Sequence, residues 1–192
     1  MKVIGITGGI GSGKTTTCEI FEQLGAPVYY ADKRAKELMA TDHNLKNKII
    51  QAFGEQVFSG GQLNRAYLAR QVFRSKEKLS VINGLVHPAV ANDFDEWLEE
   101  HKGEKYVLKE AAILFESGAY QDVDITILVI APEEVRLERV ISRDDSTREE
   151  VLSRMKNQWN QERKVKLADH IINNDGLQLL TPQVLALHQK FR

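Results

Sequence analysis

Short apolar runs alternate with segments of helical periodicity along the chain. Five runs are rich in apolar and β-branched residues, which is typical of strands buried in a parallel sheet. These runs are 3–7, 28–30, 106–108, 125–130 and 170–173. Because helical segments separate the runs, the pattern predicts an α/β protein with a five-stranded parallel sheet.

Two helical interruptions divide the predicted sheet. The larger one follows the second strand and contains no convincing strand, and its predicted helices are 33–40, 45–53, 66–73 and 88–101. His87 is expected to cap the last of these, with Pro88 at its first helical position. The smaller one follows the fourth strand, where 147–150 fits a capping box and opens a polar helix through about residue 159. Helices are also predicted over 15–24, ending at Gly25, and after Pro132 and Pro182.

Composition narrows the class of protein. The 192 residues carry 26 basic and 27 acidic side chains, for a net charge of −1, which argues against broad nucleic-acid or membrane-surface binding. A single cysteine, Cys18, excludes an internal disulfide and favours a reducing compartment. No apolar run approaches the roughly 18 residues of a spanning helix, and the first run is too short for a signal peptide. We therefore expect a soluble cytoplasmic protein, monomeric or weakly oligomeric.

Residues 8–15 read Gly-Gly-Ile-Gly-Ser-Gly-Lys-Thr and fit the phosphate-loop pattern G-x-x-x-x-G-K-[ST]. Glycines let backbone N–H groups approach phosphate oxygens, and the helix that follows adds its positive N-terminal end. Lys14 is expected to reach the β- and γ-phosphates, and the Thr15 hydroxyl to ligate Mg²⁺. The residues expected to bind ATP here are Gly9, Gly11, Ser12, Gly13, Lys14, Thr15 and Thr16.

The remaining motifs favour a small-molecule kinase. The chain has neither an Asp-x-x-Gly nor an Asn-Lys-x-Asp element, which a GTPase switch would be expected to carry. A long helical insertion suits an enzyme that must build an acceptor pocket and exclude water.

Two carboxylates stand at expected strand ends. Asp32 follows the second strand, where it could accept the proton of an attacking hydroxyl or cap the next helix. Glu110 could lie near the metal ion, directly or through water, or it could be solvated beyond the end of its strand. Both pairs of interpretations stay open.

Basic residues cluster around the smaller interruption. Arg139, Arg143 and Arg148 could neutralise a phosphoryl group in transfer, or form surface ion pairs. Arg163 and Lys164 could reach phosphate in the same way.

Taken together, these segments resemble the dephospho-coenzyme A kinase family over almost the whole chain. The likeness rests on residues 6–14, 24–28, 31–32, 85–88, 113–116, 143–148 and 168–174. It implies a three-layer P-loop kinase fold with a nucleotide-binding core, a helical coenzyme A-binding part and a lid. The core would comprise residues 1–31, 104–142 and 168–192. The helical part would comprise residues 32–103, and the lid residues 143–167.

The resemblance also implies a reaction and its residues. The γ-phosphoryl group of ATP would pass, with Mg²⁺ as cofactor, to the ribose 3′-hydroxyl of dephospho-coenzyme A, the last step of coenzyme A synthesis. The implied catalytic residues are Asp32, Lys14, Arg143 and Arg148, and Arg143 and Asn174 join the ATP site. The implied acceptor contacts are Thr7, Asp32, Arg65, His87, Leu114, Phe115 and Glu116.

Two departures from the family pattern stand out. Tyr30 replaces the first acid of an Asp-Ala-Asp segment, so the base role rests on Asp32 alone, and Ala112 replaces a common proline. Two alternatives remain: a kinase for another acceptor, such as a nucleoside monophosphate, and a nucleotide-binding regulatory protein without turnover.

Overall fold

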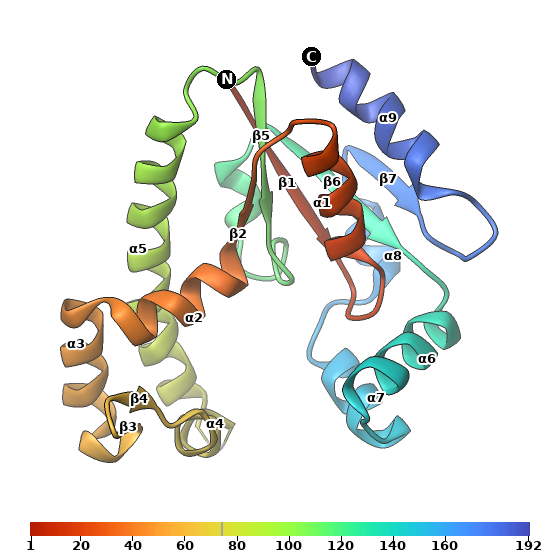
Figure 1. The fold of residues 1–192 in the computed structure, drawn as a ribbon. Helices are drawn as coiled ribbons and strands as arrows, with labels where there is room; N and C mark the ends of the chain where they lie inside the picture. Colours follow the sequence, from red (N-terminus) through yellow and green to blue (C-terminus); the bar gives the residue numbers. More distant parts are fainter. Residues whose placement is uncertain (74) are drawn as a thin grey trace. The chain divides into compact units, whose positions relative to one another are not determined.

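The computed structural model describes residues 1–73 and 75–192, which form two compact units (Figure 1). The first unit contains residues 1–30 and 101–192, and the second contains residues 31–100. In the first unit, five parallel strands form one sheet in the order β2-β5-β1-β6-β7. The strands are β1 (Lys2–Gly8), β2 (Val28–Tyr30), β5 (Tyr106–Glu110), β6 (Ile125–Ile130) and β7 (His170–Asn173). The predicted five-stranded parallel sheet is confirmed.

The strand order places β1 at the centre of the sheet. The chain adds β2 and β5 on one side of β1, and then β6 and β7 on the other side. Ligands of open parallel sheets gather beyond the carboxyl ends of the strands, beside the strand where the order reverses. The loop that follows β1 lies at this position.

Two helices cover one face of this sheet (Figure 1). Cys18 and Phe21 of α1 (Lys14–Gln23) pack with Val184 and Phe191 of α9 (Leu180–Phe191) against the buried strands. As predicted, Gly25 follows the end of α1, where its φ of 85° suits a glycine. The side chain of Cys18 is fully enclosed in this core.

The other helices of this unit follow β5 and β6. A short 3₁₀ helix, η2 (Ala119–Asp122), precedes β6. Helices α6 (Glu133–Asp144), α7 (Arg148–Lys156) and α8 (Gln161–Val165) lie between β6 and β7. The predicted capping box is confirmed, because Thr147 and Glu150 exchange side-chain and backbone hydrogen bonds at the start of α7.

The second unit is mainly helical and has its own apolar core. Its helices are α2 (Ala31–Thr41), α3 (His43–Phe53), η1 (Glu55–Val57), α4 (Arg65–Phe73) and α5 (Lys76–Glu100). Leu45, Ile49, Val57, Ile82 and Val86 form the centre of this core.

Two predictions for this unit are wrong. Pro88 lies inside the 25-residue helix α5 and does not begin it. The helix continues through Pro88 because the apolar residues Ile82 and Val86, one turn apart, bury their side chains in the core. A small hairpin of β3 (Phe58–Ser59) and β4 (Gln62–Leu63) was also not predicted.

Candidate active site

The phosphate loop connects β1 to α1 in a conformation that needs glycine. Gly11 and Gly13 have φ values of 78° and 92°, in the left-handed region that other residues rarely adopt. Within the loop, the Ser12 N–H donates to the carbonyl of Gly9 at 3.0 Å. Among the described residues, no side chain caps the N-terminus of α1, where Gly13 is the N-cap residue. The first N–H groups of α1 therefore form a site suited to an anion.

Neighbouring side chains surround the loop closely enough to exclude a larger residue. A Cβ atom on Gly9 would lie 2.0 Å from Nη1 of Arg136, and one on Gly13 would lie 2.1 Å from Nδ2 of Asn174. A Cβ atom on Gly11 would lie 2.4 Å from the backbone oxygen of Arg136. At Gly11 and Gly13, close packing and the left-handed backbone conformation both favour glycine, whereas only the tip of the flexible Arg136 side chain approaches Gly9.

Lys14 and Glu110 lie close together at the carboxyl ends of β1 and β5. The Lys14 ammonium donates to the carbonyl of Gly8 at 3.1 Å, and its Nζ lies 4.0 Å from Oε1 of Glu110. Glu110 is the last residue of β5, pairs in register with Ile6, and is 7% exposed. The interpretation that the strand ends before Lys109 and Glu110 is therefore wrong. A buried carboxylate stands beside the lysine of the phosphate loop.

The threonines after Lys14 differ in exposure. Thr15 and Thr16 are exposed, whereas Thr17 is buried and donates its hydroxyl to the carbonyl of Gly13 at 3.0 Å. Among the described residues, no three or more His, Cys, Asp or Glu side chains come together to hold a metal ion. The hydroxyl of Thr15 and the carboxylate of Glu110 are hard oxygen donors, which fit Mg²⁺ only if substrate and water supply the other ligands.

Two buried hydroxyl groups lie at the base of the loop. Oγ1 of Thr7 and Oγ of Ser12 are fully enclosed and make no hydrogen bond with any described residue. Thr7 is 0% exposed, so its predicted contact with the acceptor is not available on the surface of this structure.

Helix α6 supplies arginines that contact the loop region. Arg139 donates to the backbone oxygen of Asn174 at 3.1 Å, and the Asn174 amide donates to the carbonyl of Ser12 at 2.8 Å. Asn174 thus supports the phosphate loop, and its predicted place beside adenine remains a prediction. Arg136 lies against Gly9, and burial lowers the pKa of its guanidinium, which is nevertheless charged at neutral pH. Arg136 was not among the site residues predicted from the sequence.

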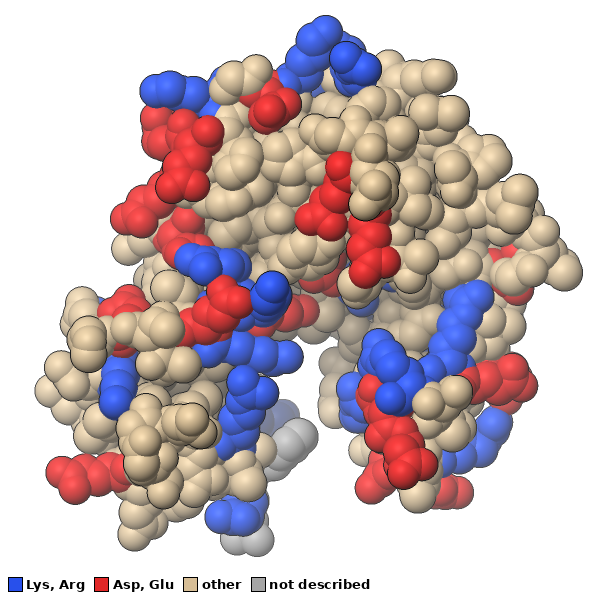
Figure 2. Space-filling view, in the orientation of Figure 1, with Lys and Arg blue, Asp and Glu red and all other residues tan. Residues whose placement is uncertain are grey.

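Arg143 and Arg148, in contrast, form ion pairs on the surface. Arg143 pairs with Asp144 at 2.7 Å, and Arg148 pairs with Glu134 at 2.7 Å. The guanidinium of Arg143, followed by that of Arg154, holds the pKa of the Asp144 carboxyl well below its usual range. Charged side chains of both signs lie side by side in this region (Figure 2). A role for either arginine in phosphoryl transfer remains a prediction.

The loop after β5 is anchored in the interior. Leu114 and Phe115 are 0% and 1% exposed, so neither predicted acceptor contact presents a side-chain surface. Glu116 forms an ion pair with Lys164 at 2.6 Å and accepts a hydrogen bond from the backbone N–H of Trp159 at 3.0 Å. Lys164 is 1% exposed, and it holds Glu116 instead of extending toward the phosphate loop.

The predicted site residues of the second unit are exposed on its helices. Asp32 lies in the first turn of α2, which begins at Ala31, so Asp32 is not its N-cap. Arg65 is the first residue of α4, and His87 lies within α5. All three residues are exposed to solvent.

Tyr30, which departs from the family pattern, has a structural role. Its hydroxyl donates to Oε2 of Glu22 at 3.0 Å, and its ring packs against the core that contains Cys18. Burial and the bond to Glu22 raise the pKa of Tyr30, which keeps the phenol neutral. The side chain at position 30 therefore belongs to the packing between β2 and α1.

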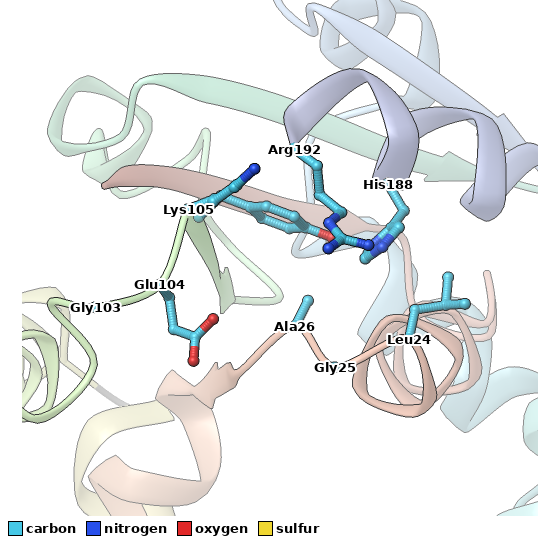
Figure 3. A pocket seen from close by; sticks show the side chains of 9 residues that line it. Leu24, Gly25, Ala26, Gly103, Glu104, Lys105, His188 and Arg192 are labelled. Carbon is cyan, nitrogen blue, oxygen red and sulfur yellow. The ribbon is translucent and has the colours of Figure 1, made fainter.

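A separate cavity of about 430 Å³ lies at the opposite end of the strands (Figure 3). It adjoins Tyr106 at the start of β5, whereas Glu110 at the end of β5 faces the phosphate loop. The basic residues Lys105 and Arg192 line this cavity near the C-terminal ends of α1 and α9, whose carbonyl groups favour positive charge. The cavity is therefore distinct from the phosphate site.

None of the helices in the described part of the chain has the length and apolar character needed to cross a membrane.

Comparisons with known proteins agree with this geometry. The family model described as dephospho-CoA kinase matches residues 2–179. The chain belongs to the dephospho-CoA kinase family. The dephospho-CoA kinase of Bacteroides fragilis strain YCH46 is 41% identical over 184 residues, covering 96% of this chain and 90% of that protein. That of Salinibacter ruber is 44% identical over 179 residues, covering 92% and 90%.

Two solved structures superpose on this chain over almost its whole length. The dephospho-CoA kinase from Campylobacter jejuni superposes with a TM-score of 0.71 at 27% identity, over 98% of this chain and 96% of that chain. The crystal structure of TT1252 from Thermus thermophilus superposes with a TM-score of 0.90 at 35% identity, over the same shares. The predicted P-loop kinase fold is confirmed.

Proposed function

We propose that the protein transfers the γ-phosphoryl group of ATP to the ribose 3′-hydroxyl of dephospho-coenzyme A. Family membership supports the choice of acceptor. The observation that carries the proposal is the phosphate loop, with the uncapped N-terminus of α1 and Lys14 beside the buried Glu110. This arrangement supports binding of a polyphosphate at the central strand of the sheet.

The residues of the first unit hold the donor. N–H groups from Gly11 to Thr16 bind the phosphate oxygens, and Lys14 neutralises the charge that develops between the β- and γ-phosphates. The exposed hydroxyl of Thr15 is available to Mg²⁺, which shields the phosphate charge when it is bound. Glu110 lies within 4.0 Å of Lys14, so its carboxylate can orient the ammonium group or water on the ion.

The acceptor is activated by a carboxylate of the second unit. Asp32 accepts the proton of the 3′-hydroxyl while the hydroxyl oxygen attacks the γ-phosphorus and ADP leaves. Asp32 follows Tyr30, the last residue of β2, by only two residues along the chain, which supports its nearness to the carboxyl ends of the strands. Arg143 and Arg148 would exchange their surface carboxylate partners for phosphate oxygens. Arg65 and His87, which are exposed, would contact the acceptor.

We also propose that the enzyme acts in the cytoplasm, in keeping with its unpaired, buried Cys18.

An acceptor panel tests the proposed reaction. Purified protein is incubated with ATP and Mg²⁺, and ADP release is measured with dephospho-coenzyme A, with AMP and with no acceptor. We expect fast release only with dephospho-coenzyme A, together with a product heavier by one phosphoryl group. Lys14→Met should remove this activity, whereas Lys190→Met in α9 should retain it. Faster release with AMP would assign the protein to another acceptor, and release independent of acceptor would exclude the proposed transfer.

A further inference from the structure

The side chain of Gln158 connects two loops at the carboxyl ends of the central strands. Its Oε1 accepts a hydrogen bond from the N–H of Ile10 in the phosphate loop at 2.9 Å. Its Nε2 donates to the carbonyl of Ala112, in the loop after β5, at 3.1 Å. One amide group therefore spans the loop beside Lys14 and the loop that begins next to Glu110.

The segment that carries Gln158 is itself anchored at two further points. The N–H of Trp159 donates to Glu116 at 3.0 Å, and Lys164 of α8 pairs with the same carboxylate at 2.6 Å. Lys164 is 1% exposed, so this ion pair is held away from solvent. Gln158 thus extends from a fixed base, and its position is determined by contacts other than its own two hydrogen bonds.

Packing and one backbone hydrogen bond also restrain the phosphate loop at this point, since Arg136 lies against Gly9 and the Ser12 N–H donates to the Gly9 carbonyl. Glycines on both sides of Ile10 give the backbone unusual conformational freedom. Ile10 itself packs against the small apolar cluster of Leu137, Val140 and Val151, which α6 and α7 supply. Packing alone does not orient the peptide group of Ile10, whereas the hydrogen bond to Gln158 does, because hydrogen bonds are directional.

We propose that Gln158 is a positioning residue that preorganises the phosphate loop for the triphosphate. The inference rests on the proposed function, since it concerns the same donor site. Without the amide, the free loop occupies additional conformations, and ATP binds only the fraction that has the correct one. The apparent dissociation constant rises in inverse proportion to that fraction.

Gln158→Met tests the proposal, because methionine keeps the length of the side chain and loses both hydrogen bonds. We expect the dissociation constant for ATP, measured without acceptor, to rise about tenfold, which corresponds to about 1.4 kcal/mol. Hydrogen–deuterium exchange in the peptide that contains Ile10 should also become faster. If Gln158→Met does not fold, Gln158→Asn, whose shorter side chain cannot span both partners, carries the same test.

Gln183→Met is the matched control. The Gln183 amide also bonds to the backbone: it accepts from the N–H of Asn173 at 2.8 Å and donates to the carbonyls of Asn173 at 2.9 Å and Leu179 at 3.0 Å. Its loss should lower Tm to a similar extent and leave ATP binding within about twofold of the original value.

An unchanged ATP dissociation constant in Gln158→Met, with Tm lowered as in the control, would overturn the proposal and leave Gln158 a purely structural role. Because no acceptor is present, this result is independent of whether dephospho-coenzyme A is the true acceptor.

Discussion

The buried ion pair between Glu116 and Lys164 allows a sharp test of how the site is held together. Their side chains are 11% and 1% exposed, and the charged atoms lie 2.6 Å apart. Lys164→Met removes one charge and leaves the carboxylate of Glu116 in a desolvated position. Removal of one partner from a buried pair costs about 3–5 kcal/mol, and we expect the free energy of unfolding to fall by that amount.

The double variant Glu116→Gln/Lys164→Met distinguishes the cost of leaving one charge unpaired from the net contribution of the ion pair to stability. Glutamine keeps an oxygen that can accept from the N–H of Trp159, and neither new side chain is charged. Replacement of both charges by neutral groups of similar size is often close to neutral. We therefore expect the double variant to recover about 2–3 kcal/mol relative to Lys164→Met.

Urea denaturation followed by circular dichroism measures all four members of this cycle. The decrease in the free energy of unfolding caused by Lys164→Met should change little with added salt, because the ion pair is shielded from solvent. A loss below about 1 kcal/mol in Lys164→Met would refute the reasoning, since it would place the pair among exposed ion pairs. The reasoning would also be refuted if the free-energy changes of the two single variants simply added up to that of the double variant.

Three further predictions concern catalysis, the phosphate loop and pH. Asp32→Asn should lower kcat by roughly 10²–10⁴ and leave the ATP dissociation constant unchanged, and near-normal turnover in a steady-state assay would exclude Asp32 as the base. Gly13→Ala should lower the free energy of unfolding by about 2–4 kcal/mol, because alanine disfavours a φ of 92° and its Cβ would displace the amide of Asn174. An unaltered urea midpoint would contradict this. Burial lowers the pKa values of His188 and His170 below 6.5. These two residues therefore do not reduce the free energy of unfolding above pH 6.5, and they lower it increasingly as the pH falls below 6.5. His188→Gln should reduce the slope of the free energy of unfolding below pH 6.5, and an identical slope would show that His188 does not contribute.

Local sequence signals were sufficient for the donor half of the site. The phosphate-loop pattern, the apolar run before it and Gly25 after the helix depend on residues that are neighbours in the chain, and each is found where it was predicted. The strands were found for the same reason, since runs of β-branched residues predict buried parallel strands regardless of their partners. The hairpin β3–β4 could also have been found, because Gly60-Gly61 between two short runs is a known two-residue turn signal.

Other features depended on contacts between residues far apart in the chain. A proline pattern alone suggested that a helix starts at Pro88, whereas burial of Ile82 and Val86 extends α5 back to Lys76. The sequence left the end of β5 ambiguous, because charged residues such as Lys109 and Glu110 are rare in buried strands. Their pairing with β1 shows that the strand includes both residues.

The roles of the residues after α7 were likewise decided by the tertiary structure. Gln158 contacts Ile10 across 148 positions and Ala112 across 46, and Lys164 meets Glu116 in the interior. No local pattern distinguishes such a glutamine or lysine from a solvated one. The sequence by itself therefore determined that the chain carries a phosphate-binding loop, because that loop depends on one short backbone motif. Only the tertiary structure decided what holds the motif in place, because burial and hydrogen-bond partners depend on how distant segments pack.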